Sequence, residues 1–263
     1  MLPAPRILFT ALRYQMDAHR ANPANLWAGG LGMFINNAIF LAGMWGLIFA
    51  GKPQNNSILA YYFSLSFVVM LSWGGLNFFL CGYRRLGDLI TNGELEPLLA
   101  TPRPVLGLVA IAYSSPFALG DLIMGALGLI WVGFQFGWGI SARSVLATGL
   151  SGLGFAALFI GAGSLAFFIP RGANVSQFLI ESMLSLTVQP SGKIFGDRGR
   201  MLVLLTPAAA AGMLPLDFVE KGTWGSFAVA LGSALLFLSL ALVLFRVGLR
   251  RYQAVSLIQA RSH

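Results

Sequence analysis

Residues 145–169, VLATGLSGLGFAALFIGAGSLAFFI, decide the fold of this chain. No charged residue interrupts this run, and small residues recur along it. At about 1.5 Å per residue, a helix of this length exceeds the roughly 30 Å hydrocarbon core of a bilayer. The run therefore predicts a membrane-spanning helix. Its small residues recur at steps of three and four, which favours close packing against another helix of the same chain over a seam between two subunits. They are Ala147, Ser151, Gly154, Ala157, Gly161 and Ser164.

Comparable apolar runs lie on both sides of this one. The chain has 263 residues, of which 57% are hydrophobic and 10% charged, whereas soluble domains carry about 25% charged residues. We therefore expect an all-α polytopic membrane protein with about six transmembrane helices, folded as one domain over residues 1–263. The other spans are predicted at 26–50, 58–80, 105–136, 174–190 and 227–247. The run 105–136 is too long for one perpendicular helix, and Ser114-Ser115-Pro116 predicts a kink in it.

The basic residues are distributed between the apolar runs. Of the 17 lysines and arginines, eleven fall on the side of the N-terminus and six on the other side, if six spans separate them. The excess of positive charge predicts that both termini are cytoplasmic. The cations form no stripe with interleaved aromatics, so we expect no nucleic-acid partner. Cys81 is the sole cysteine, and the two histidines, His19 and His263, lie at opposite ends of the chain, so no metal site is expected.

Two segments outside the spans have their own patterns. In residues 1–25, Arg6, Thr10, Arg13, Asp17 and Arg20 recur at helical spacing, which favours an amphipathic helix in the membrane interface over a solvated tail. Residues 190–222 alternate short apolar pieces with charges, glycines and prolines. Two half-length pieces, 201–206 and 207–214, predict an extracytoplasmic re-entrant hairpin, which must be covered by protein or water.

Residues 83–103 form a polar segment on the predicted cytoplasmic side. They indicate two short helical pieces broken at Asn92-Gly93, with acidic residues placed among leucines. Apolar anchors with charges around them are typical of docking into a groove of a partner protein. The alternative is an ordinary loop that folds against the lipid headgroups. The candidate docking residues are Arg84, Arg85, Asp88, Gly93, Glu94, Leu95, Glu96, Leu98 and Leu99.

Two motifs resemble those of the integral membrane subunits of type-2 ABC exporters, in the uncharacterised paired-permease branch. The pattern G-E-L-D-x-x-L-x-x-P is matched by Gly93, Glu94, Leu95, Glu96, Leu99 and Pro102, with Glu96 where aspartate is common. A second motif, which follows the fifth span, is matched by Pro190, Ile194, Phe195, Arg200 and Pro207, with Gln189 where an aromatic residue is common. These departures leave the implied mechanism unchanged and show that the motif is loose.

The resemblance implies an elbow helix at the N-terminus and a coupling helix in residues 83–103. It also implies two ABC ATPase subunits as partners, a second permease copy or a paralogue, and a multi-pass location in the bacterial inner membrane. No phosphate-binding loop occurs in this chain, because Gly51-Lys52 and Gly192-Lys193 lack the glycine spacing and the following hydroxyl. We therefore expect no enzymatic activity, cofactor or metal in the chain itself, with ATP and magnesium bound by the ATPase.

Two carboxylates lie inside apolar runs, Asp121 and Glu181. A carboxylate at this depth costs at least about 2.5 kcal/mol, so both are candidates for the transport pathway. Alternatively, each caps a kink or bonds a neighbouring serine, or Asp121 lies near a boundary shifted by helix tilt.

The preferred function is outward movement of a hydrophobic or amphipathic solute, driven by a separate ATPase. The rivals are a proton-coupled secondary transporter, for which no internal repeat is evident, and a membrane-embedded lipid-modifying enzyme, for which no catalytic partner residues are evident.

Overall fold

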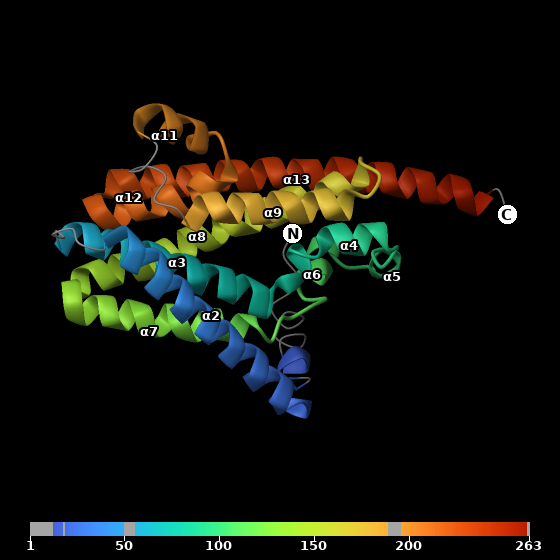
Figure 1. Ribbon diagram of the computed structural model, residues 1–263. Coiled ribbons are helices and arrows are strands. Elements are labelled where there is room, and N and C mark those ends of the chain that lie inside the picture. Colours follow the sequence, from blue (N-terminus) through green and yellow to red (C-terminus); the bar gives the residue numbers. More distant parts are fainter. Residues whose placement is uncertain (1–12, 18, 50–55, 189–195, 262–263) are drawn as a thin grey trace.

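A computed structural model describes residues 13–17, 19–49, 56–188 and 196–261 (Figure 1). Within these ranges all regular structure is helical. The long helices are α2 (Pro23–Phe49), α3 (Asn56–Phe79), α7 (Ala118–Phe136), α8 (Trp138–Ser164), α9 (Gly172–Val188) and α13 (Trp224–Arg261). The short elements are η1 (Cys81–Tyr83), α4 (Leu86–Thr91), α5 (Glu96–Leu99), α6 (Val105–Ala110), η2 (Leu165–Phe167), α11 (Gly196–Leu204), η3 (Ala209–Met213) and α12 (Leu214–Lys221).

Five helices in the described part of the chain are long and apolar enough to cross a membrane, or six if the bent pair α11 and η3–α12 counts as one span. They are α2, α3, α7, α8 and α13. The predicted fifth span corresponds to α9, which has 17 residues and is shorter than these five. The all-α polytopic membrane fold predicted from the sequence is therefore confirmed.

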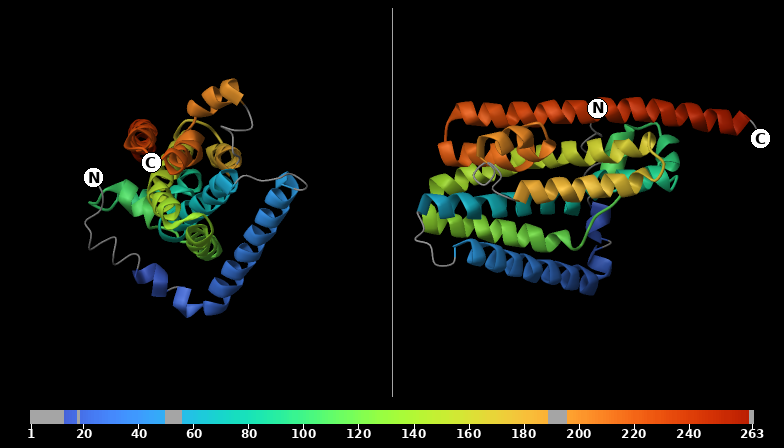
Figure 2. Two further views of the ribbon diagram at one scale, coloured as in Figure 1. Left: turned by 90° about the vertical axis from the view of Figure 1, so that its left-hand side faces the viewer. Right: turned by 45° about the horizontal axis from the view of Figure 1, so that its top comes forward.

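The long helices run side by side, with α8 in the interior of the bundle and α2 leaning against α7 at one edge (Figures 1 and 2). The described residues before α2 and the C-terminal end of α13 lie at the same end as α4 and α5 (Figure 1). The hairpin formed by α11 and α12 lies at the opposite end.

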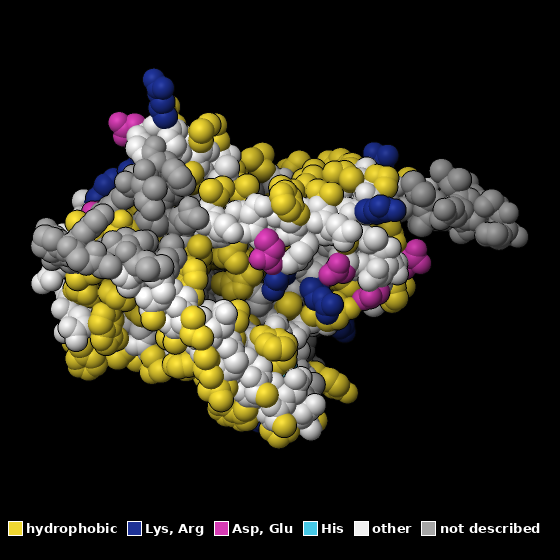
Figure 3. Space-filling model, in the orientation of Figure 1, with side chains coloured by type: hydrophobic (Ala, Val, Ile, Leu, Met, Phe, Trp, Pro, Cys, Tyr) yellow, Lys and Arg dark blue, Asp and Glu magenta, His cyan; other side chains and the backbone are white. Residues whose placement is uncertain are grey.

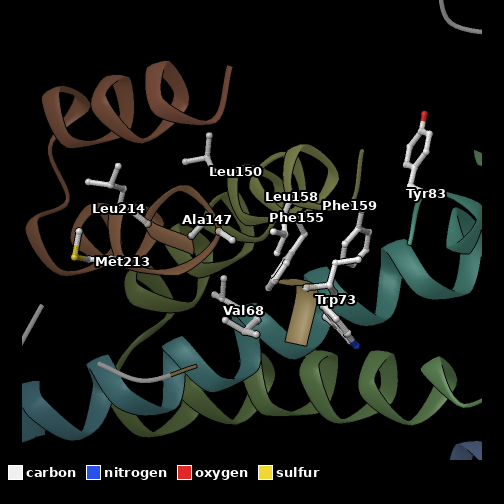
Figure 4. Packing of buried hydrophobic residues seen from close by; sticks show 14 of the residues in the cluster. Val68, Trp73, Tyr83, Ala147, Leu150, Phe155, Leu158, Phe159, Met213 and Leu214 are labelled. Atoms are coloured by element: carbon white, nitrogen blue, oxygen red, sulfur yellow. The ribbon is translucent and has the colours of Figure 1, made fainter. Parts of the chain in front are cut away.

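The core lies mainly between α3 and α8, whose facing side chains appear in Figure 4. The Trp73 ring meets Phe155 and Phe159 edge to face, with ring centroids 5.4 and 5.2 Å away. Such pairs add about 0.5–1.5 kcal/mol beyond the burial of their area. Phe155 and Phe159 are fully buried, so α8 is held on α3 by interlocked aromatic rings.

The small residues of the run at 145–169 pack within the chain, as predicted. A Cβ added to Gly154 would lie 2.5 Å from the backbone nitrogen of Ala211 in η3, so only glycine permits this approach. One turn away, the Ser151 hydroxyl donates to the Ala211 carbonyl at 2.5 Å. These contacts cover the π-helical turn η3 with protein.

The segment predicted as a hairpin consists of two helical pieces, with bounds of 196–204 and 209–221 rather than 201–206 and 207–214. Helix α11 and the pair η3–α12 are bent by 102° at a break after Leu204. In η3, residues 209–211 are fully buried, which satisfies the condition that irregular backbone at membrane depth be covered. Because residues 189–195 lie outside the described ranges, the structure says nothing of the motif residues Pro190, Ile194 and Phe195.

The predicted kink in the third span is a complete break between α6 and α7. The Ser115 backbone N–H donates to the Asn77 carbonyl at 3.0 Å, and the Ser114 hydroxyl donates to the Phe78 carbonyl at 2.5 Å. These carbonyls belong to the last turn of α3, where intrahelical partners run out. Hydrogen-bond donors in the break therefore pair with carbonyls at the end of α3 that lack a partner within the helix.

Two helices extend beyond the predicted spans. Helix α8 begins at Trp138 rather than at 145, and includes Arg143, whose Nε donates to the Gly139 carbonyl at 3.2 Å. Helix α13 runs to Arg261 rather than to 247. Hydropathy marks the part of a helix that lies in lipid, whereas backbone hydrogen bonding continues into polar flanks.

Candidate functional site

The segment 83–103 folds as η1, α4 and α5 at one end of the bundle. Its two helical pieces are separated near Asn92-Gly93, as predicted, and Gly93 has a φ of 75°. This left-handed conformation favours glycine, which has no Cβ to clash. The glycine of the motif therefore lets the chain reverse direction between α4 and α5.

The apolar and the charged side chains of this segment point in different directions. Leu86 and Leu95 are fully buried, and Leu89 and Ile90 are nearly so, whereas Arg85, Asp88, Glu94 and Glu96 are exposed. Leu98 and Leu99 are partly buried against the same core. A partner would therefore meet the charged side chains, while Leu95 stabilises the fold of this chain.

Helix α4 sits tightly on two long helices through glycines. A Cβ on Gly87 would lie 3.1 Å from the Ser176 Cβ of α9. A Cβ on Gly163 of α8 would lie 2.7 Å from the Leu86 Cβ. Since close-packed interfaces have no room to slide freely, a displacement of α4 has to move α8 or α9.

Arg84 links the start of the segment to α9. Its Nη2 donates to Glu181 Oε1 at 2.9 Å, and Gln177 Nε2 donates to the same oxygen at 2.6 Å. The guanidinium also lies over the Trp73 ring, 5.1 Å from its centroid. The Glu181 carboxylate is thus paired with a cation. Ser185 bonds only the Glu181 backbone carbonyl.

Glu94 links the turn of the segment to the break in the third span. The Tyr113 hydroxyl donates to its carboxylate, and Asn92 Nδ2 donates to it at 3.4 Å. These hydrogen bonds, of which that from Tyr113 matters most, hold the pKa of Glu94 below its usual range. Arg85 lies over the Tyr113 ring, 4.5 Å from its centroid.

The N-terminal segment meets the same break. Residues 13–17 and 19–21 are helical, and a non-helical Asn22 separates them from α2, as the Asn22-Pro23 pair predicts. Gln15 Nε2 donates to the Ile111 carbonyl at 2.8 Å and to the Tyr113 carbonyl at 3.2 Å. His19 Nε2 lies 2.8 Å from Ser114 Oγ in a shared hydrogen bond. Residues 1–12, which complete the predicted interfacial helix, are outside the described ranges.

Asp121 lies away from these contacts, in the first turn of α7. It is 4% exposed, and its Oδ1 accepts a hydrogen bond of 2.6 Å from Asn37 Nδ2 of α2. A Cβ on Gly74 of α3 would lie 2.7 Å from its Cβ. Asp121 therefore joins α2 to α7 against α3, and its partners differ from those of Glu181.

Figure 3 shows acidic and basic side chains gathered over α4 and α5, beside broad apolar surfaces along the bundle. Among the described residues, no group of three or more histidines, cysteines or acids could hold a metal ion.

The sequence matches the ABC-2 family of transporter proteins over residues 54–256, more than three quarters of the chain. Searches of curated proteins and of solved structures returned no match. The family match includes the candidate docking segment, the break in the third span and the re-entrant hairpin. On this match and the helical fold, the chain belongs to the ABC-2 family and is a multi-pass membrane permease of an ABC transporter.

Proposed function

We propose that this chain is the membrane subunit of an exporter that moves a hydrophobic or amphipathic solute outward. A separate ATPase, docked on the exposed charges of residues 83–103, supplies the energy. One observation carries the proposal: the segment that presents those charges is bonded to two different spans. Arg84 reaches Glu181 of α9, and Glu94 reaches Tyr113 at the break before α7.

These bonds offer a route for alternating access. Closure of the ATPase would push on α4 and α5, and the tight contacts of Gly87 and Leu86 would pass the displacement to α9 and α8. Tyr113 and Ser114 would pass it to the break, where α7 can pivot on α6. The solute is moved only if its affinity differs between the inward and outward states.

The proposed assembly has two ATPase subunits and a second permease, either a copy of this chain or a paralogue. We place it in the bacterial inner membrane with both termini and residues 83–103 in the cytoplasm. The excess of arginine on that side supports this orientation. Residues 13–17 and 19–21, α4, α5 and the end of α13 lie at a common end of the bundle, which also supports this orientation (Figure 1).

Copurification tests the docking surface. The variant E94K/E96K places two cations where two exposed carboxylates stand, and we expect it to lose the ATPase during purification from native membranes. D197K is the matched control, since Asp197 is exposed on α11 at the other end of the bundle. The permease itself should run unchanged on a sizing column. An intact complex with E94K/E96K would remove the docking assignment.

The energy source is tested in vesicles that contain the purified complex. We expect vanadate to stop transport and an uncoupler to leave it unchanged. The reverse result would support a proton-coupled carrier. In that case Asp121, a buried carboxylate within a span, would be its first candidate.

A further inference from the structure

An open pocket of about 410 Å³ lies at the end of the bundle opposite α4 and α5. It is formed where the re-entrant hairpin meets the start of α13. Its volume falls within the range of small-molecule sites, roughly 300–1,000 Å³. The lining residues are Arg200 and Leu204 of α11, Leu214, Asp217 and Lys221 of α12, and Thr223, Ser226 and Val229 at or near the start of α13.

The charges of the pocket do not cancel. Asp217 Oδ2 accepts a hydrogen bond from Arg200 Nη2, and Lys221 Nζ lies 3.6 Å from the same oxygen. The Asp217 side chain is 11% exposed, but those of Arg200 and Lys221 are 35% and 55% exposed. One buried carboxylate therefore holds two cations in place, and the pocket keeps one positive charge in excess.

The pocket also has an apolar wall that continues onto an apolar surface. Leu204, Leu214 and Val229 line it, and the neighbouring Met201 and Leu202 of α11 and Leu205 just after α11 are 68–78% exposed. Exposed apolar side chains such as these are energetically favourable when lipid covers them. Trp224, at the start of α13, is 77% exposed, as expected for an indole in the headgroup layer.

We propose that this pocket binds the phosphate of an anionic phospholipid from the leaflet at this end of the bundle. The phosphodiester carries one negative charge, which matches the excess charge of Arg200 and Lys221. The hydroxyls of Thr223 and Ser226 lie 3.0 Å apart at the mouth, where the Ser226 hydroxyl donates to the Thr223 carbonyl at 2.8 Å, so the two cations are the donors for the phosphate. The acyl chains lie along the exposed side chains of α11. A lipid bound in this pocket holds α11 and α12 against the start of α13.

Within the described ranges, the other charged groups near this pocket do not line it. Arg143 of α8 comes close to Gly222, but it lines a separate pocket together with Glu220. Asp197 and Arg198 are exposed on α11 and do not line the phosphate pocket. Arg198 therefore serves as a control that has the same helix and the same charge.

Native mass spectrometry of the full chain in a neutral detergent tests the proposal. Phosphatidylglycerol is titrated against diacylglycerol with the same acyl chains, and inorganic phosphate is titrated alone. We expect phosphatidylglycerol to bind, and K221Q to weaken its binding about fivefold, the size of one partly exposed charge contact. D217N frees both cations and should strengthen binding by about the same factor. R198Q should leave it unchanged.

The opposite response of K221Q and D217N separates a binding site from general damage, because a damaged fold would lose lipid in both variants. Equal weakening by K221Q and R198Q would overturn the proposal. So would equal binding of diacylglycerol and phosphatidylglycerol. Binding of inorganic phosphate as tight as that of the lipid would overturn the lipid assignment. Failure of ATPase copurification would remove the proposed function without affecting this result.

Discussion

Arg84 and Glu181 are hydrogen-bonded at 2.9 Å across 97 positions of sequence, from the residue after η1 to the middle of α9. The pair is partly exposed, with side-chain exposures of 29% and 50%, so its contribution to stability is at most about 1 kcal/mol. Under the proposed mechanism, this pair connects the docking segment to α9, so that a displacement of the segment also moves that helix.

Charge reversal at this pair separates coupling from stability. R84E and E181R, taken singly, should uncouple ATP hydrolysis from transport, while the double variant R84E/E181R restores the attraction and much of the coupling. Transport per ATP hydrolysed is the measurement. D197N, in which an exposed acid of α11 outside the docking segment is neutralised, is the control. Coupling that is no better in the double variant than in the singles would contradict the role of this pair.

Gly154 and Gly152 make a matched pair for the packing of the hairpin on α8. A Cβ at Gly154 would meet backbone atoms of η3 within 2.7 Å, but a Cβ at Gly152 has no neighbour within 4 Å. We expect G154A to destabilise the fold by roughly 1–3 kcal/mol through overpacking. G152A should be neutral or slightly stabilising. Thermal unfolding in detergent measures both, and equal melting temperatures would refute the close contact.

Asp121 and Asn37 form a buried polar pair whose loss is predicted to be asymmetric. D121L leaves the Asn37 amide without its acceptor, at a cost of about 1–3 kcal/mol, whereas N37L/D121L replaces both partners by apolar groups and should recover stability. Transport by the double variant is the decisive readout. Activity retained there marks Asp121 as a structural residue, and activity lost at restored stability assigns it to the pathway.

The hydrogen bonds to Glu94 predict a pH dependence. The pKa of Glu94 is lowered in the folded chain. These bonds therefore stabilise the fold fully at any pH above the ordinary glutamate pKa of about 4.3. This stabilisation is lost as the pH falls through the lowered pKa that Glu94 has in the folded chain. The melting temperature of the wild type should therefore exceed that of E94Q at neutral pH, and the difference should vanish in strong acid. A difference that disappears already near pH 6 would contradict the lowered pKa.

The spans could be predicted from sequence because lipid imposes one simple requirement, an uncharged run of sufficient length. The break at Ser114 and Ser115 was also visible, since proline and serine interrupt the pattern. The partners of this break were not visible. Gln15, His19 and Glu94 approach it over sequence separations of 19 to 98 residues, and no local pattern encodes such pairings. The sequence signal for these contacts was limited to the polar side chains of the predicted N-terminal amphipathic helix.

The docking segment shows a second limit of the sequence. Leucines placed among charges look the same whether they anchor a partner or their own core. The structure buries Leu86 and Leu95 inward and leaves Arg85, Glu94 and Glu96 outside. The segment could be located from the sequence because it lies between two spans. The direction of its side chains depends on Gly87 and Gly163, whose close contacts appear only in the folded structure.

This division of the segment into an inward apolar side and an outward charged side has a consequence for how such transporters diversify. The exposed charges that a companion protein would touch are separate from the buried leucines that pack against the core. After gene duplication, a few changes of surface charge could give each descendant its own companion, while the bundle stays intact.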